Sequence, residues 1–329
     1  MPESDKRVGI TTTIPVEIVF AAGRTPVDLN NRFVTSPDPA ILVEEAEHAG
    51  FPRNLCAWIK GIYSAVRREG IRTVIAVARG DCSNTHALAE ILETEGAEIV
   101  DFSFPYRRGS AELAAELTKL CDRLGTTMEE AEEQRRRLVP ARDVGREIDR
   151  LTFEERRVSG EENHQWLINC SDFGGDADRY QSEAAAFVER ARGRPPMADG
   201  IRLGVIGIPP ICSDLYAVLE EFGAAVVFNE MQRQFSMPYD AGTLLEQYRR
   251  YTYPYDIFFR LDDIERELER RRIAAVVHYV QSFCFRSLQD RLVRRRLNVP
   301  VLTLECDRPG PLDARSRTKI EAFMEILGA

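Results

Sequence analysis

Short apolar runs alternate with amphipathic segments along the first third of the chain. Residues 8–12 and 25–29 have the composition of short strands, and residues 15–22 between them have helix-like apolar spacing. Apolar residues recur with the period of a helix through 55–68. The run TVIAVA at 73–78 is apolar throughout, which is typical of a strand buried on both faces. A helix and a strand are expected next, at 84–95 and 98–102. This alternation predicts a doubly wound parallel sheet.

The last third of the chain repeats this plan. We expect alternating strands and helices there, at 202–208, 214–222, 225–228, 274–280, 286–297, 299–304 and 316–327. The segment KRVGITTTIP resembles IRLGVIGIPP, and RTVIAVARGDC resembles AAVVHYVQSFC. A repeat of this extent indicates two similar α/β domains that arose by duplication.

The region between the two repeats is rich in Ala, Glu and Arg, as in AELAAELTKL and EEAEEQRRR, and ends in the Pro- and Gly-containing stretch RGRPPMADG. Such composition favours helices followed by a linker. We therefore predict an α/β domain at 1–112, a helical connecting region at 113–200 and a second α/β domain at 201–329. Both α/β domains should be of the doubly wound, Rossmann- or flavodoxin-like kind, with the functional site in a crevice between them.

Composition narrows the class of protein. The 329 residues contain 44 Lys and Arg against 53 Asp and Glu, a net charge of −9, which argues against a nucleic-acid partner. The N-terminus lacks the apolar stretch of a signal peptide, and no apolar run is long enough to span a membrane. We expect a cytoplasmic protein, in which the seven cysteines do not form disulfides because that compartment is reducing.

Three cysteines occupy positions at which α/β proteins commonly bind ligands. Cys82 follows the apolar strand at 73–78, and Cys284 follows the corresponding strand of the second domain. Ligands of open α/β sheets bind outside the carboxyl ends of strands. Cys56 comes at the start of a predicted helix, where partial positive charge favours a thiolate. The chain has no C-x-x-C pair, so zinc-ribbon and ferredoxin patterns are absent, and on spacing alone buried structural cysteines remain the simpler interpretation.

The residues around these cysteines resemble a known family. The similar segments are IPVEIVFAAGRTPVDLNN, PRNLCAWIKG, RGDCSNTH and the long C-terminal stretch that includes VPVLTLECDRPGPLDARSRTKIEAFMEIL. Together they resemble the cluster-bearing subunits of 2-hydroxyacyl-CoA dehydratases and benzoyl-CoA reductases, such as the 2-hydroxyglutaryl-CoA dehydratase D-component, and the chain is most similar to short stand-alone members. The resemblance covers nearly the whole chain apart from its helical middle.

The resemblance implies one [4Fe–4S] cluster per chain, held by Cys56, Cys82 and Cys284, with the fourth iron open to water or substrate. It also implies an ATP-dependent activator protein with its own cluster, which injects a strongly reducing electron. An acyl-CoA substrate then becomes a ketyl radical and loses water. A homodimer, or a heterodimer with a related subunit, is expected.

The chain departs from its relatives at two points. Some relatives hold a double-cubane cluster with extra cysteines in the second domain, but the segments NEMQRQFSMPYDAG and RYTYPYDIFFRLDD contain none. Ser83 stands after the second cluster cysteine, where many relatives have Asp. The first departure favours a single cluster.

Further residues are candidates for supporting roles. Cys212 is a candidate additional ligand, although a plain loop cysteine is favoured, and Cys306 is expected in the core. Cys121 and Cys170 are also expected in the core. Glu17 is a candidate general base with a structural role equally open, and His86, one helical turn after Cys82, is a candidate for proton transfer.

Three functions therefore remain open. The first is a radical dehydratase or reductase acting on an acyl-CoA or another small molecule. The second is a cluster-bearing electron-transfer or accessory subunit without its own substrate. The third is a metal-free binding protein with two α/β lobes and structural cysteines.

Overall fold

The computed structural model describes residues 6–328 and contains two four-stranded, wholly parallel sheets. The first has the order β2-β1-β3-β4, from β1 (Arg7–Ile10), β2 (Thr25–Asp28), β3 (Thr73–Arg79) and β4 (Glu98–Ser103). The second has the order β6-β5-β7-β8, from β5 (Ile201–Gly207), β6 (Ala224–Asn229), β7 (Ala275–Val280) and β8 (Val301–Glu305). The identical strand order confirms the predicted doubly wound fold.

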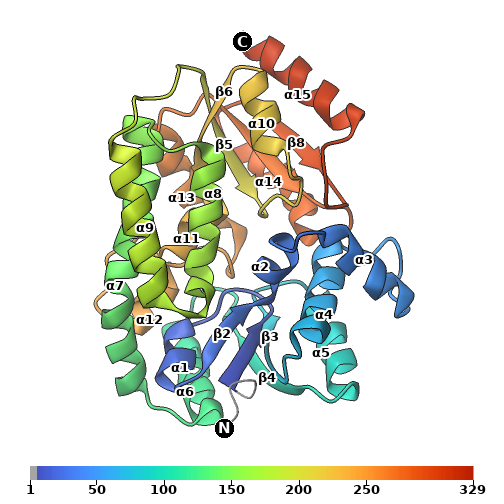
Figure 1. The fold of residues 1–329 in the computed structure, drawn as a ribbon, viewed down its shortest axis with the longest axis vertical. Coiled ribbons are helices and arrows are strands. Elements are labelled where there is room, and N and C mark those ends of the chain that lie inside the picture. The colour runs from blue at the N-terminus through green and yellow to red at the C-terminus, as the bar shows by residue number, and fades with distance from the viewer. Residues whose placement is uncertain (1–5, 329) are drawn as a thin grey trace. The chain divides into compact units, whose positions relative to one another are not determined.

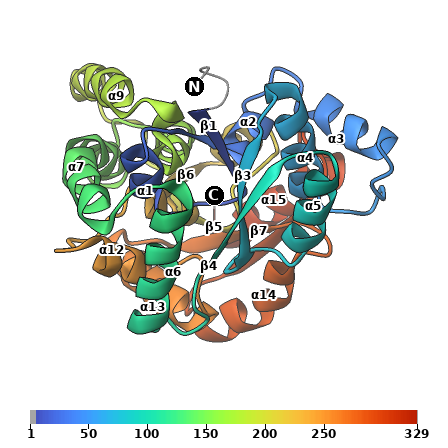
Figure 2. The ribbon, with the colours of Figure 1, turned by 90° about the horizontal axis from the view of Figure 1, so that it is seen from below.

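Helices cover both faces of the first sheet. They are α1 (Val16–Ala21), α2 (Leu29–Val34), α3 (Pro39–His48), α4 (Ala57–Glu69), α5 (Asn84–Thr94) and α6 (Ser110–Leu124). Figure 2 shows α4 and α5 side by side on one face and α1 and α6 on the other. The strand order explains this for α1, α4 and α5: the β1–β2 crossover runs along the sheet in the opposite direction to the β2–β3 and β3–β4 crossovers, and right-handed crossovers of opposite direction lie on opposite faces.

The middle of the chain is helical, as expected. It contains α7 (Met128–Arg150), a single π-helical turn (Leu151–Glu155), α8 (Gly160–Ile168), two short 3₁₀ segments (Asn169–Ser171 and Phe173–Gly175) and α9 (Ala177–Arg192). The last third of the chain contains the helices that Figure 1 labels α10 (Leu215–Glu221), α11 (Glu230–Phe235), α12 (Leu244–Arg250), α13 (Ile257–Arg270), α14 (Phe285–Arg296) and α15 (Ala314–Leu327). No described helix is both long and apolar enough to cross a bilayer.

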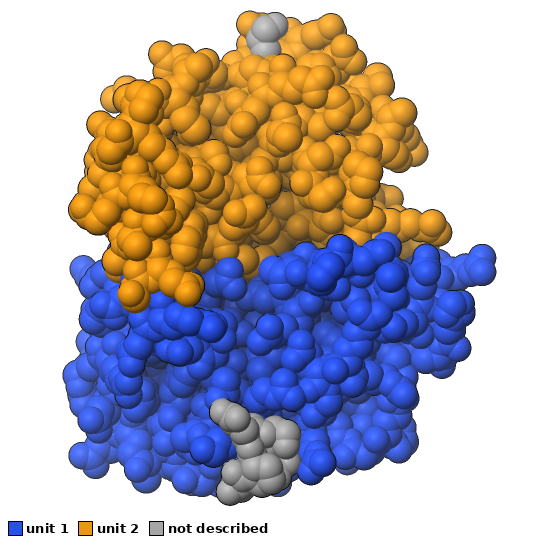
Figure 3. Space-filling model, in the orientation of Figure 1, with its two compact units in different colours: residues 1–143, 169–181, 237–256 blue, residues 144–168, 182–236, 257–329 orange. Residues whose placement is uncertain are grey.

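The chain forms two compact units that are not continuous in sequence (Figure 3). Unit 1 contains residues 1–143, 169–181 and 237–256, and unit 2 contains 144–168, 182–236 and 257–329. The helical middle is thus divided between them, and α12 packs in unit 1, against α6, although it follows β6 in the chain. The domain boundaries given above stay a prediction.

Element ends differ from the expected ones where side chains cap helices. The strand expected at 25–29 ends at Asp28, because the Asp28 carboxylate accepts hydrogen bonds from the backbone N–H groups of Asn30 and Asn31 and starts α2 at Leu29. Asp38 starts α3 in the same way. Neither α2 nor α3 was expected.

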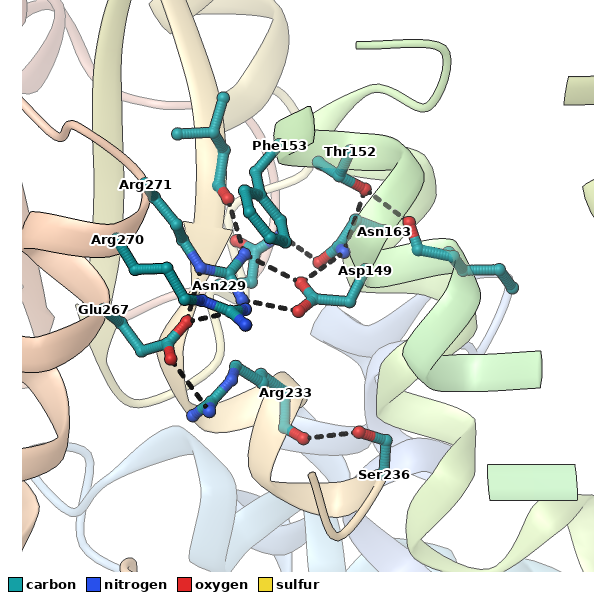
Figure 4. A network of polar contacts seen from close by, with 12 residues as sticks. Asp149, Thr152, Phe153, Asn163, Asn229, Arg233, Ser236, Glu267, Arg270 and Arg271 are labelled. Atoms are coloured by element: carbon teal, nitrogen blue, oxygen red, sulfur yellow. Dashed lines mark hydrogen bonds and ion pairs between the residues drawn. The ribbon is translucent and has the colours of Figure 1, made fainter. Parts of the chain in front are cut away.

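Buried ion pairs hold unit 2 together beside an apolar core. Arg271, at the end of α13, is wholly buried and lies between Asp149 and Glu267 (Figure 4). Its guanidinium carbon lies 4.2 Å from the ring centre of Phe153 and 4.9 Å from that of Phe228. Burial alone would raise the pKa of Asp149, but Arg271 and Arg233 lower it overall. The Asp149 carboxylate is therefore held ionised inside the protein.

Unit 1 contains a buried pair of carboxyl groups. Asp172 accepts a hydrogen bond of 2.7 Å from the backbone N–H of Asp28 and one of 2.8 Å from that of Gly174. Burial, followed by the charge of Asp28, raises the pKa of Asp172 to about 7, and burial also raises the pKa of Asp28. The positive charge of Arg32 lowers the pKa of Asp172, but by less than burial and Asp28 raise it.

This carboxyl pair should make unit 1 less stable as the pH rises. Between the pKa of an unfolded Asp, 3.8, and about 7, folded Asp172 holds a proton that the unfolded chain has lost, so stability falls with rising pH in that window. Chemical denaturation of wild type and Asp172→Asn from pH 5 to 7 should show the difference in unfolding free energy moving in favour of the variant by about 1.4 kcal/mol per pH unit. Parallel pH profiles would contradict this.

Candidate functional site

Cys56 lies directly at the start of α4. It is the N-cap residue, its backbone is extended, and its carbonyl accepts a hydrogen bond from the N–H of Lys60. Lys60 is itself buried and pairs with Glu47 at 2.7 Å, while also donating to the carbonyl of Arg53. The first turn of α4 is thus anchored to the segment that precedes it. The half-buried thiol of Cys56 stands where helix N–H groups favour a thiolate.

Cys82 lies in the tight connection between β3 and α5. Gly80 has a φ of +105°, and a Cβ there would come within 3.0 Å of Phe104 and Pro254, so only glycine fits. The carbonyl of Cys82 accepts a hydrogen bond of 3.0 Å from the N–H of Thr85. The half-buried Cys82 is thereby fixed at the N-terminus of α5, one residue before the N-cap, Ser83.

Cys284 has the matching position in unit 2. It is the N-cap residue of α14, and its carbonyl accepts hydrogen bonds from the N–H (2.9 Å) and the Oγ (2.7 Å) of Ser287. Ser282, two residues earlier, donates through its hydroxyl to Glu305 and Asp307 and through its N–H to Asp307. The segment that carries the half-buried Cys284 is therefore tied to the end of β8.

The three cysteines share one structural position. β3 and β7 are the third strands of their sheets, and Cys82 and Cys284 follow them, as predicted. Because α4 leads into β3, and α5 leaves it, both helices begin at the carboxyl edge of the first sheet. Cys56 and Cys82 belong to unit 1, and Cys284 belongs to unit 2. Within residues 6–328, no three His, Cys, Asp or Glu side chains are gathered as a metal site, so the predicted ligation stays a prediction.

Some buried polar groups at this same edge of unit 1 have no hydrogen-bond partner among residues 6–328. They include the hydroxyls of Thr13 and Thr85 and the indole N–H of Trp58. Thr13 follows β1, Trp58 is two residues after Cys56, and Thr85 is three residues after Cys82. Buried donors without partners are rare and call for a bound acceptor. Two thiols at helix N-termini, each with an unpartnered buried donor two or three residues further along the same helix, fit an anionic iron–sulfur cluster. Their closeness in sequence to the cysteines could have revealed Trp58 and Thr85.

Glu17 is wholly buried in unit 1. Its Oε1 accepts hydrogen bonds from Arg142 (2.6 Å) and Gln247 (2.7 Å), and its Oε2 accepts one from Tyr248 (2.8 Å). His86, by contrast, is exposed in the first turn of α5. The contacts of Glu17 account for a structural role, and a catalytic role for Glu17 or His86 stays a prediction.

Cys212 and Cys306 are disulfide-bonded in unit 2, which corrects the expectation of no disulfide and of a core role for Cys306. The two residues are 94 positions apart in sequence, but they follow β5 and β8, which flank β7 in the sheet. The hydroxyl of Tyr279 in β7 donates a hydrogen bond to the disulfide sulfur of Cys212 and accepts one from the N–H of Ile211. Sequence spacing could not reveal this pairing, because strand order creates it.

The other cysteines are buried, as expected. Cys121 contacts the sulfur of Met128, and burial, followed by Asp122 and Glu130, raises the pKa of its thiol to about 11. Cys170 lies 3.0 Å from the hydroxyl of Tyr180. The Cys121 thiol therefore favours the protonated, unreactive form.

The family model for the 2-hydroxyglutaryl-CoA dehydratase D-component matches residues 11–327. The chain belongs to this family. The match includes all three predicted cluster cysteines and confirms the resemblance drawn from the sequence. A comparison with curated proteins finds no match. Membership places the chain among dehydratase components, which work with an activator and partner subunits.

Proposed function

We propose that this D-component family member holds one [4Fe–4S] cluster through Cys56, Cys82 and Cys284. The observation that carries the proposal is their shared position, each at the N-terminus of a helix of at least eleven residues. Helix N-termini favour thiolates and offer N–H groups to sulfur. The unpartnered donors of Thr13, Trp58 and Thr85 at the edge that carries two of these thiols support the same assignment. When bound, the cluster would supply a low-potential electron and an open iron.

Other residues of the chain fix the segments that carry the proposed ligands and supply a proton-transfer group. Gly80 lets the backbone turn tightly enough to place Cys82 at the start of α5. Ser282 fixes the segment before Cys284 through Glu305 and Asp307. We assign proton transfer to His86 in preference to Glu17, because both carboxylate oxygens of Glu17 already accept hydrogen bonds from neighbouring side chains.

We propose that the reaction is the dehydration of a 2-hydroxyacyl-CoA, or the reduction of a related acyl-CoA, driven by an ATP-hydrolysing activator that has its own cluster. A second copy or a related subunit would complete the assembly, in the cytoplasm. The support for this assignment is the family match over residues 11–327 together with the thiol arrangement.

This function can be tested by turnover. Anaerobically prepared protein is mixed with ATP, Mg²⁺, an activator of this family and a panel of 2-hydroxyacyl-CoA thioesters, with 2-hydroxyglutaryl-CoA included. We expect loss of one thioester and formation of its enoyl product, and no product with Cys82→Ala. If the activator reduces the protein but no thioester is consumed or bound, the chain is an electron-carrying accessory subunit instead.

A further inference from the structure

Two unpartnered donors stand beside the proposed cluster ligands of unit 1. The hydroxyl of Thr85 and the indole N–H of Trp58 are buried and make no hydrogen bond to any described residue. A buried donor that loses water without gaining an acceptor costs about 1–3 kcal/mol. Both donors lie within three residues of a proposed ligand, Cys56 or Cys82. We therefore expect a bound group at this place to supply the missing acceptor.

Thr85 lies on the inner face of α5. It shares the buried face of that helix with Leu88 and Leu92, at a spacing of three and seven residues. Its backbone N–H is engaged by the carbonyl of Cys82, so Thr85 and Cys82 are rigidly linked. Its hydroxyl has no partner in the part of the chain that the structure describes, although 99% of the residue surface is buried.

Trp58 has the corresponding place on α4. It lies in the first turn after the N-cap Cys56, and its ring packs edge-on against Phe33 of α2, with ring centres 5.5 Å apart. Gly61 allows this packing, because a Cβ there would come within 2.2 Å of the Phe33 ring. The contact with Phe33 orients the indole, and its N–H has no partner among residues 6–328.

We propose that Thr85 and Trp58 donate hydrogen bonds to sulfur atoms of the cluster held by Cys56 and Cys82, and thereby raise its reduction potential. The inference rests on the proposed cluster. Reduction adds negative charge to the sulfurs, so a donor hydrogen bond stabilises the reduced form more than the oxidised form. The same bonds slow the loss of iron, as outer-shell partners of metal ligands do.

The test uses Thr85→Val, Trp58→Phe and the double variant of the anaerobically prepared full chain. Thr94→Val is the matched control, because Thr94 lies on the same helix and its hydroxyl already donates to the carbonyl of Ile91. A redox titration followed by electron paramagnetic resonance should give a more negative midpoint potential for each single variant, and a larger shift for the double variant. Release of iron to a chelator should be about 10-fold faster.

A second measurement excludes a merely structural role. In the iron-free protein, Thr85→Val should unfold at the same temperature as wild type or a higher one, because a methyl group replaces an unsatisfied hydroxyl. A lower unfolding temperature, or midpoint potentials and iron-release rates equal to those of Thr94→Val, would overturn the inference. If wild type itself binds no iron after anaerobic reconstitution, the proposed function fails as well, and the iron content separates that result from the failure of the inference alone.

Discussion

The variant Arg271→Met should lose about 3–5 kcal/mol of unfolding free energy, which is typical when one partner of a buried ion pair is removed. Arg271 donates to Glu267 (2.7 Å), to both oxygens of Asp149 (2.9 and 2.5 Å) and to the carbonyl of Val227 (2.8 Å). Without it, two buried carboxylates lose their nearest cation (Figure 4). Chemical denaturation of the purified variant measures the loss.

The neighbouring Arg270 supplies the matched control. Its side chain is 51% exposed, pairs with Glu267 at 3.1 Å and also lies over Phe153. Arg270→Met should therefore cost no more than about 1 kcal/mol, as exposed ion pairs do. Equal losses for the two variants would contradict the network described for unit 2.

The second large effect is expected at Glu17. The variant Glu17→Ala should lose about 3–5 kcal/mol of unfolding free energy, because it leaves the guanidinium of Arg142 buried without its anion. Burial alone lowers the pKa of Arg142, yet Glu17 raises it overall, so the charge persists inside unit 1. Denaturation of Glu17→Ala, Arg142→Met and the double variant measures the coupling.

The double variant should lose less than the sum of the two single variants, because it leaves no unpaired charge. Additive losses would show that Glu17 and Arg142 do not act as a pair. Normal stability in Glu17→Ala, together with lost turnover, would instead favour the catalytic role that the sequence suggested for Glu17.

The sheets were predictable because parallel strands buried on both faces appear as apolar runs, as in TVIAVA. The likeness of the two α/β halves was also visible, and the shared strand order confirms that likeness. The division of the chain between the two units was not predictable in the same way, because residues 237–256 return to unit 1 through long-range packing that local sequence patterns do not show. Arg271 likewise carries the local signal of an exposed helix end, and only the tertiary structure reveals its burial.

The candidate site shows the same division. Helix starts and strand ends placed Cys56, Cys82 and Cys284 from the sequence, but their selection among seven cysteines came from the family resemblance. The disulfide between Cys212 and Cys306 depends on the order of strands in the sheet, which local patterns do not encode. The structure is also needed to see that the Thr85 hydroxyl and the Trp58 indole N–H are buried without a hydrogen-bond partner among the described residues.

The most direct test of the central claim is the iron and acid-labile sulfide content of anaerobically prepared wild type, Cys284→Ala and Cys121→Ala. Cys121 is the matched control, because it is a buried core thiol. We predict about four iron and four sulfide per chain in wild type and in Cys121→Ala, and loss of both in Cys284→Ala. Wild type without iron after anaerobic reconstitution, or equal iron in Cys284→Ala, would contradict the assignment of one cluster to these three cysteines.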